Sequence, residues 1–446
     1  MPLKSTLGAL REQSIIGVNH LGEKYWVDVT ANANGEGGAP DNYGNYHFFT
    51  STDKFVLIDE RNITANVDLS TGTYSNVNTI LETSLAVNGN TVILGYRGSN
   101  VSNSYATIGA IFVNNGVGNT GMALSTSVAS TNQYGNVSVD GSNNYYICGY
   151  LQNNGIIAKY NSSKTLQWQR RPSIALSNAQ IKITDAVSDG LDIYAVGVTQ
   201  NSANVIGTRG GHIIKISSTG NVIWSKSTGN FQLERIAFID NSSNLIVAGA
   251  QSISNTGGIA KIALDGTVIS KAVITANTIY GNNQAPITLL SVDTNNNVVV
   301  GGQYLDSTYV PQAGLFTGYI MGFNSNITST RFIKRVVARN PSGANARITL
   351  QTVSQVANSA IFIAGSTLAS MGVNIKTAYD GNTLGTGNYI VGNATVIYND
   401  TTQFTFAYNN TAFTTSNITL SNTTFTTSVT TNTLTPSTLT IDKKFI

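Results

Sequence analysis

The sequence predicts an all-β fold, and three observations support this prediction. A strand-turn-strand pattern recurs along most of the 446-residue chain. The glycines that end its second strand stand at positions 95, 149, 197, 249, 302 and 365, about the spacing of four-stranded repeats. No long segment has the 3.6-residue periodicity of a helix. Together they predict a β-propeller of about seven four-stranded blades, followed by a C-terminal β-rich extension.

The first half of each repeat reads as a β-hairpin. Its clearest copies cover residues 137–150, 186–197, 238–249 and 292–302, and weaker copies cover 85–95 and 353–365. In each copy a short apolar strand leads into polar turn residues, mainly Asp, Asn, Ser and Gly, and a second apolar strand follows. These turn residues adopt positive φ or cap their own backbone, which favours tight hairpins.

The second half of each repeat adds two more strands. It opens at a glycine in the four clear copies, namely Gly155, Gly211, Gly258 and Gly318. A lysine recurs at Lys159, Lys215 and Lys261, and a tryptophan recurs at Trp168 and Trp224, with Ser270 near that place in the next copy. The complete repeat therefore has four strands.

The repeat divides the chain into three parts. Residues 1–14 are predicted to be an N-terminal arm, residues 15–388 the propeller and residues 389–446 a Thr/Asn-rich extension. The predicted units are 15–79, 80–131, 132–178, 179–230, 231–277, 278–340 and 341–388, the first recognised by Lys24-Tyr25-Trp26-Val27 and by Phe55–Ile58. The extension is rich in residues that favour strands. Three roles are open to it: completing the ring, forming a small sheet, or adding strands to a neighbouring subunit, which we favour.

Composition excludes several classes of protein. Charged residues make up only 11%, and the net charge of +3 is too weak for a typical nucleic-acid-binding domain. Cys148 is the single cysteine, so no intrachain disulfide is expected, and its apolar surroundings predict a buried, inert thiol. We expect no signal peptide and no membrane insertion, because no apolar run is long enough.

No catalytic, cofactor-binding or metal site is expected. His20, His47 and His212 do not form a metal-binding motif, and His212 is predicted to be an ordinary strand residue. The turns that begin at Asp140 and Asp293 resemble half of a calcium loop, but they lack its distant glutamate. No G-x-S-x-G elbow or phosphate-binding loop is present. We therefore expect a protein that is not an enzyme and that carries no cofactor.

One stretch of the chain is basic. No Asp or Glu occurs from Ser307 to Tyr379. The same stretch holds Arg331, Lys334, Arg335, Arg339, Arg347 and Lys376. We expect these six residues to form a positive surface that binds a neighbouring protein or an acidic glycan. An ordinary solvated face is the alternative.

The two half-repeats, D-x-x-G/N-N-x-Y-x-x-G and G-x-I-A-K-x-x-x-x-G-x-x-x-W, resemble the bacterial and phage β-propeller repeat family over about residues 80–390. The resemblance implies the fold and no site residues. The Asn/Thr/Ser/Gly-rich composition also resembles structural proteins of tailed phages.

We therefore expect a non-enzymatic virion protein of the tail, baseplate or fibre, folded in the host cytoplasm. Its terminal segments would bind other virion proteins in a homo-oligomeric or larger assembly, and its propeller would contact a host surface glycan or receptor. The alternatives are a capsid decoration protein, a bacterial glycan-binding surface adhesin and, less favoured, a propeller hydrolase or lyase.

Overall fold

The structure is a computed structural model, and it describes most of the repeat region and parts of the C-terminal extension. The described residues are 26–30, 35–40, 46–50, 54–58, 63–68, 79–88, 91–99, 106–114, 117–126, 133–151, 154–174, 179–201, 210–251, 256–276, 285–304, 317–339, 348–367, 372–381, 387–391, 394–401, 404–409, 416–417, 420–424, 428–436 and 442–445. The expected N-terminal arm over residues 1–14 lies outside them. Among these residues no helix is long and apolar enough to span a bilayer.

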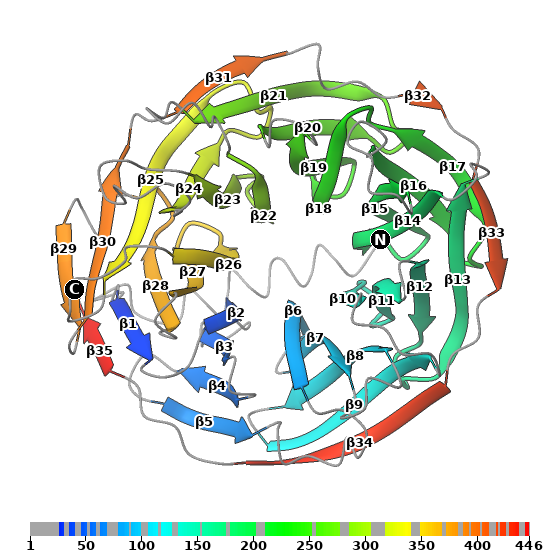
Figure 1. Cartoon of the computed structure of the whole chain (residues 1–446), viewed down its shortest axis with the longest axis horizontal. Coiled ribbons are helices and arrows are strands. Elements are labelled where there is room, and N and C mark those ends of the chain that lie inside the picture. Colours follow the sequence, from blue (N-terminus) through cyan, green and yellow to red (C-terminus); the bar gives the residue numbers. More distant parts are fainter. Residues whose placement is uncertain are drawn as a thin grey trace.

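Seven groups of antiparallel strands, numbered here as blades 1 to 7, follow one another around a ring (Figure 1). Blade 1 contains β2 (Gly35–Pro40), β3 (Tyr46–Thr50), β4 (Lys54–Ile58) and β5 (Ile63–Asp68). Blade 2 contains β6 (Thr79–Asn88), β7 (Thr91–Ser99), β8 (Ala106–Asn114) and β9 (Val117–Thr126). Blade 3 contains β10 (Gln133–Val139), β11 (Tyr145–Leu151), β12 (Asn154–Tyr160) and β13 (Leu166–Ile174).

Blade 4 contains β14 (Ala179–Ser188), β15 (Asp192–Asn201), β16 (Gly211–Ser217) and β17 (Val222–Ser227). Blade 5 contains β18 (Phe231–Ile239), β19 (Asn244–Gln251), β20 (Gly257–Ala263) and β21 (Val268–Ala276). Blade 6 contains β22 (Ile287–Val292), β23 (Val298–Tyr304), β24 (Thr317–Phe323) and β25 (Thr330–Arg339). The all-β propeller predicted from the repeat is therefore confirmed.

Blade 7 is built from both ends of the repeat region. Three of its strands are consecutive, β26 (Ile348–Val356), β27 (Ala360–Thr367) and β28 (Gly372–Ala378), and the fourth is β1 (Trp26–Thr30), which pairs antiparallel with β28. The assignment of Trp26-Val27 to the first predicted unit was therefore wrong. The described part of residues 341–388 supplies three blade strands, and β1 completes that sheet and closes the ring.

The C-terminal segment forms a strap around the outside of the ring, drawn in orange and red in Figure 1. We call residues 387–445 the strap. Its strands are β29 (Gly387–Val391), β30 (Ala394–Asp400), β31 (Phe404–Tyr408), β32 (Ser416–Asn417), β33 (Leu420–Thr424), β34 (Ser428–Pro436) and β35 (Asp442–Phe445).

The strap visits the blades in reverse order. β30 pairs with β25, β31 with β21, β32 with β17, and β33 with β13. β34 then pairs with β9 and with the end of β5, and β35 pairs with β1. The predicted strands of the C-terminal extension thus pair within their own chain, and β34 joins blades 1 and 2 into one nine-stranded sheet.

The described core lies between neighbouring blades of the range 3 to 7, and blades 4, 5 and 6 each contribute buried side chains on both faces of their sheets. β19 and β24 are buried almost throughout, as expected for strands covered on both faces. One cluster joins Tyr194 and Ile213 of blade 4 to Phe231, Leu245 and Ile262 of blade 5. Apolar runs without alternation, which mark the second and third strands of each repeat, follow from this two-sided burial.

The aspartates of the hairpin turns act as backbone caps. The Oδ1 atom of Asp140 accepts the N–H groups of Ser142 and Asn144 at 2.8 and 2.9 Å. Asp293 accepts those of Asn295 and Asn297 at 2.9 and 2.8 Å in the same way. The carboxylates that resembled calcium ligands therefore have a structural role in closing the turns.

Candidate functional site

The inner strands of several blades carry β-bulges at matching places, and Thr184, Asp185 and Glu234 lie at two of these bulges. The register shifts at residues 183–185 of β14, 233–235 of β18, 287–289 of β22 and 350–352 of β26. A bulge frees backbone groups from the ladder of its own sheet. These groups become available for bonds between blades.

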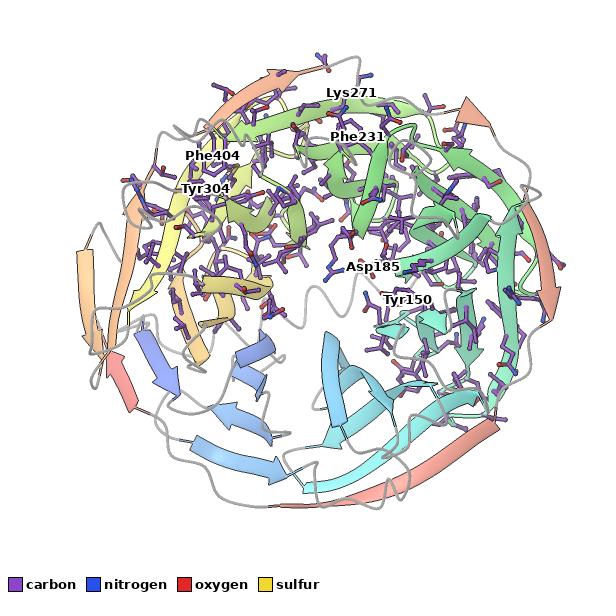
Figure 2. All side chains as sticks on the ribbon, in the orientation of Figure 1. Tyr150, Asp185, Phe231, Lys271, Tyr304 and Phe404 are labelled. Atoms are coloured by element: carbon purple, nitrogen blue, oxygen red, sulfur yellow. The ribbon has the colours of Figure 1, made fainter. Side chains whose placement is uncertain are left out.

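Asp185 uses this arrangement to join three blades, and Figure 2 shows it on the inner side of the ring. Its Oδ1 atom accepts two hydrogen bonds, each of 2.8 Å. One comes from Asn136 Nδ2 of blade 3, and the other comes from the backbone N–H of the next residue, Ala186. Its Oδ2 atom accepts the N–H of Ile236 in blade 5 at 3.0 Å. The side chain is therefore held by donors from both adjacent blades.

Thr184, the bulged residue next to Asp185, continues the same connection. The Asn136 Nδ2 group also donates to the Thr184 carbonyl at 3.2 Å. Thr184 Oγ1 donates to the Leu233 carbonyl of blade 5 at 2.7 Å. Asn136, Thr184 and Asp185 thus form what we call the axial latch.

Two carboxylates and one guanidinium meet beside this latch. Burial raises the pKa of Asp185 to about 6, and the charge of Arg235 and two backbone N–H donors partly offset that rise. Burial also raises the pKa of Glu234, while Arg235 lowers it and Asp185 raises it further. Both carboxyl groups are therefore protonated at a higher pH than they would be in water.

The chemistry available at the axis is limited in the described part of the chain. No group of three or more His, Cys, Asp or Glu side chains is arranged to hold a metal ion there or elsewhere among the described residues. Every oxygen of Asp185 already accepts a hydrogen bond. Asp185 therefore acts as a connector between blades.

Two of the six residues of the predicted basic surface do not lie on a surface. Lys334 is 1% exposed and Lys376 is 4% exposed, so both are buried and the expectation for them was wrong. Arg331 and Arg335 are partly exposed, and they donate to the carbonyls of Tyr379 at 2.9 Å and Asp400 at 3.3 Å. Arg339 lies on β25 opposite Thr395, and Arg347 lies outside the described residues.

Each buried lysine of that set has a structural partner. Lys334 Nζ lies 2.6 Å from Asp400 Oδ1, and Asp400 belongs to the strap. The strap therefore supplies the acid that the stretch from Ser307 to Tyr379 lacks. Lys376 Nζ lies 5.7 Å from the centre of the Phe362 ring across the sheet.

Lys376 is the blade 7 member of the recurring lysines. Lys376 faces Phe362 in the register just as Lys159 faces Tyr146 and Lys215 faces Tyr194. Lys159 and Lys215 also lie over those rings, at 5.8 and 5.2 Å. The repeated lysine is therefore a packing element of the blades.

The recurring tryptophan connects neighbouring blades at the outer side. Trp168 Nε1 of blade 3 donates to the Ser218 carbonyl of blade 4 at 2.8 Å. Ser270 Oγ of blade 5 donates to the Asn326 carbonyl of blade 6 at 2.5 Å at the corresponding place. Trp224 occupies this place in blade 4, but its Nε1 atom is buried without a hydrogen-bond partner.

Two further predictions concern buried titratable side chains. Cys148 is buried, as predicted, and burial raises the pKa of its thiol well above the usual range. His212 is buried on β16, where its Nε2 atom contacts Thr199 Oγ1. Burial lowers the pKa of His212 to about 4, so the ring is neutral at pH 7.

Reasoning from the sequence missed the axial cluster. A usable signal was present, because Asp185, Glu234 and Arg235 are charged residues just before apolar hairpins in a chain with few charges. Their meeting at one place requires knowledge of the ring, since they come from different repeats. His20 and the side chain of His47 lie outside the described part of the structure.

Comparisons with known proteins show similarity of fold at low sequence identity. No family model and no curated protein matches the chain. Hydrazine synthase from Kuenenia stuttgartiensis is 11% identical, with 76% of this chain and 95% of that chain covered and a TM-score of 0.46. Domains 1–2 of the Drosophila semaphorin 1a extracellular region are 7% identical, with 78% and 87% covered and a TM-score of 0.43. YCF48 bound to a D1 peptide is 10% identical, with 79% and 96% covered and a TM-score of 0.38.

Proposed function

We propose that this chain is a non-enzymatic structural protein of a tailed-phage particle, in the tail, baseplate or fibre. In this role the ring is a rigid platform that is displayed on the particle and contacts the host surface. The proposal includes membership of the phage-type propeller repeat family that the half-repeats resemble.

The strap is the observation that carries this proposal. It adds an outer strand to the blades and pairs with β1, so the outer edges and the ring closure are held by one segment. Such a ring cannot open at one place without loss of strap pairing. This resistance to opening suits a protein that must persist outside a cell without repair.

The interior and surface chemistry support the same role. The described polar clusters, including the axial latch and the recurring lysines, have structural partners. Residues 401–441 of the strap contain no charged side chain. Contacts through such a surface depend little on salt, because screening acts on charges.

Fractionation of a producing culture tests the proposal. Antibodies against the purified chain are used to follow it through a density gradient that separates complete particles from soluble protein. We expect the chain to travel with the particles and to remain bound after a wash at about 1 M salt, where the Debye length is about 3 Å. A chain found only in the soluble fraction, or in the membranes of uninfected cells, would contradict the proposal.

A further inference from the structure

The outermost strand edges of the ring belong to the strap. β31, β33 and β34 each pair with blade strands on their inner side. No described strand pairs with their outer side, and Figure 1 draws them as the outermost ribbons of the ring. An outer edge of this kind presents a row of backbone N–H and C=O groups.

β34 is the longest of these edges, and over residues 428–435 it lacks the usual protection. Proteins protect exposed edges with charged residues, proline, bulges, short strands or a covering segment, and in β34 a proline stands only at the last position. β34 has nine residues, none is charged, and its pairing with β9 runs from Ser428 to Leu434 without a register shift. By contrast, β35 carries Lys443 and Lys444. Of these two strands, β34 is therefore the one whose outer edge can form backbone hydrogen bonds with another strand without bringing charges together.

We propose that the outer edge of β34 pairs antiparallel with β34 of a second copy of this chain, about a two-fold axis. Antiparallel pairing of one strand with itself is isologous, so both copies use the same surface and the contact closes. The self-pairing brings no like charges together, because the segment has none. Pairing would extend the nine-stranded sheet of blades 1 and 2 across the dimer.

Pro436 indicates which residues face outward. Pro436 lies opposite Val67 of β5 and has no N–H group to donate. In a regular strand the N–H groups alternate between the two edges, so the proline nitrogen is tolerated where it faces away from the partner. The nitrogen of Pro436 therefore faces outward. Asn432 lies four positions before it on the same strand, so its N–H also faces outward, and the N–H of Thr433 faces β9.

A pair of proline variants tests the dimer on the purified full-length chain. Asn432→Pro removes an outward N–H, and Thr433→Pro removes an inward one. Sedimentation at rising concentration should show a wild-type species of twice the 47.2 kDa chain mass, unchanged at high salt. Asn432→Pro should stay monomeric at every concentration, while hydrogen exchange at residues 428–436 matches that of monomeric wild type. Thr433→Pro should lose that protection even as a monomer.

Three results would overturn the proposal: a wild-type chain that stays monomeric at high concentration, a dimer that Asn432→Pro leaves intact, or a dimer that high salt dissociates. The sedimentation test uses the purified chain alone. The chain can therefore be monomeric in that test and still travel with particles in the fractionation, or form a dimer and not travel with particles. The test therefore separates this proposal from the virion role.

Discussion

At the scale of single residues, burial and hydrogen bonding shift the pKa of Asp185 in opposite directions. Burial raises its pKa, whereas the Arg235 charge and backbone donors lower it, and burial prevails. His212 shows burial acting alone, and its pKa falls. Both groups titrate between about pH 4 and pH 6.5, and their effects on stability have opposite signs.

Replacing Asp185 by Asn should remove a fall in stability with rising pH. The folded-state pKa of about 6 exceeds the ordinary 3.8, so the folded state binds more protons between these values. The free energy of unfolding therefore falls by at most about 3 kcal/mol as pH rises from 4 to 6. Denaturant unfolding across this range should show that fall in the wild type and not in Asp185→Asn. The variant should also be less stable than the wild type by an amount that does not depend on pH, because the Ile236 N–H group would face the amide donor of the new asparagine. A variant that keeps the slope would contradict this assignment.

Replacing His212 by Gln should have the opposite effect on the pH profile. The folded-state pKa of about 4 lies below the ordinary 6.5, so the unfolded state binds more protons between these values. Stability is therefore lost as pH falls through this window, by about 3 kcal/mol in total. The same unfolding series should show His212→Gln to be less sensitive to acid than the wild type. Equal acid sensitivity would mean that His212 is accessible to protons in the folded state.

At the scale of the elements, neighbouring blades are joined by side chains that reach carbonyls across the boundary. Trp168 reaches the turn of blade 4, and Thr184 reaches β18 of blade 5. Trp224 has the same place in the repeat as Trp168, but its indole N–H is buried without an acceptor. The two tryptophans therefore provide a matched comparison.

Trp168→Phe should cost more stability than Trp224→Phe. The first change removes a hydrogen bond and leaves the Ser218 carbonyl without that donor, at about 1 kcal/mol. The second change removes the same chemical group where it has no partner, so only packing changes. Chemical denaturation of both variants measures the difference. Equal losses would show that the Trp168 bond contributes nothing.

The repeat could be read from the sequence because each blade is local. Hairpin turns such as Asp140-Gly141-Ser142 and the recurring Lys159 lie in the same blade as their partners. The paths of β1 and the strap could not be read, because backbone pairing over hundreds of residues leaves no side-chain pattern. The burial of Lys334 depends on Asp400, which belongs to that same strap. The axial latch likewise joins three separate repeats.

At the scale of the whole molecule, the strap can pair completely only after the ring has formed. Its partners are the fourth strands of the blades and β1, which come together when blade 7 closes. Near the beginning of the strap, Phe404 packs 4.8 Å from Tyr304 and 4.9 Å from Tyr319 between ring centres, and Figure 2 labels Phe404 and Tyr304 there. The strap is therefore a late-forming reinforcement.

A chain that ends at Asn409 should fold into the ring but unfold faster. It keeps β30 and β31 and loses β32 to β35. Contacts that form late are absent from the folding transition state, so their loss speeds unfolding and leaves the folding rate nearly unchanged. We expect unfolding at least about ten times faster, since about 1.4 kcal/mol already gives that factor. Stopped-flow unfolding measures the rate, and a chain that ends at Thr440 is the control, with a smaller effect. Equal rates for all three chains would contradict a reinforcing strap.

The most direct test of the central claim, that β1 and β35 of one chain pair in blade 7, is a disulfide between these two strands. Asp28 lies opposite Lys443 in the antiparallel register, and cross-strand partners are close enough for a disulfide. The variant Asp28→Cys with Lys443→Cys, oxidised and analysed by mass and by non-reducing electrophoresis, should give a chain closed on itself, while the native Cys148 stays reduced. Pairing Asp28→Cys with Leu434→Cys should give none. A folded chain whose two new cysteines stay free, or link only between molecules, would contradict the account.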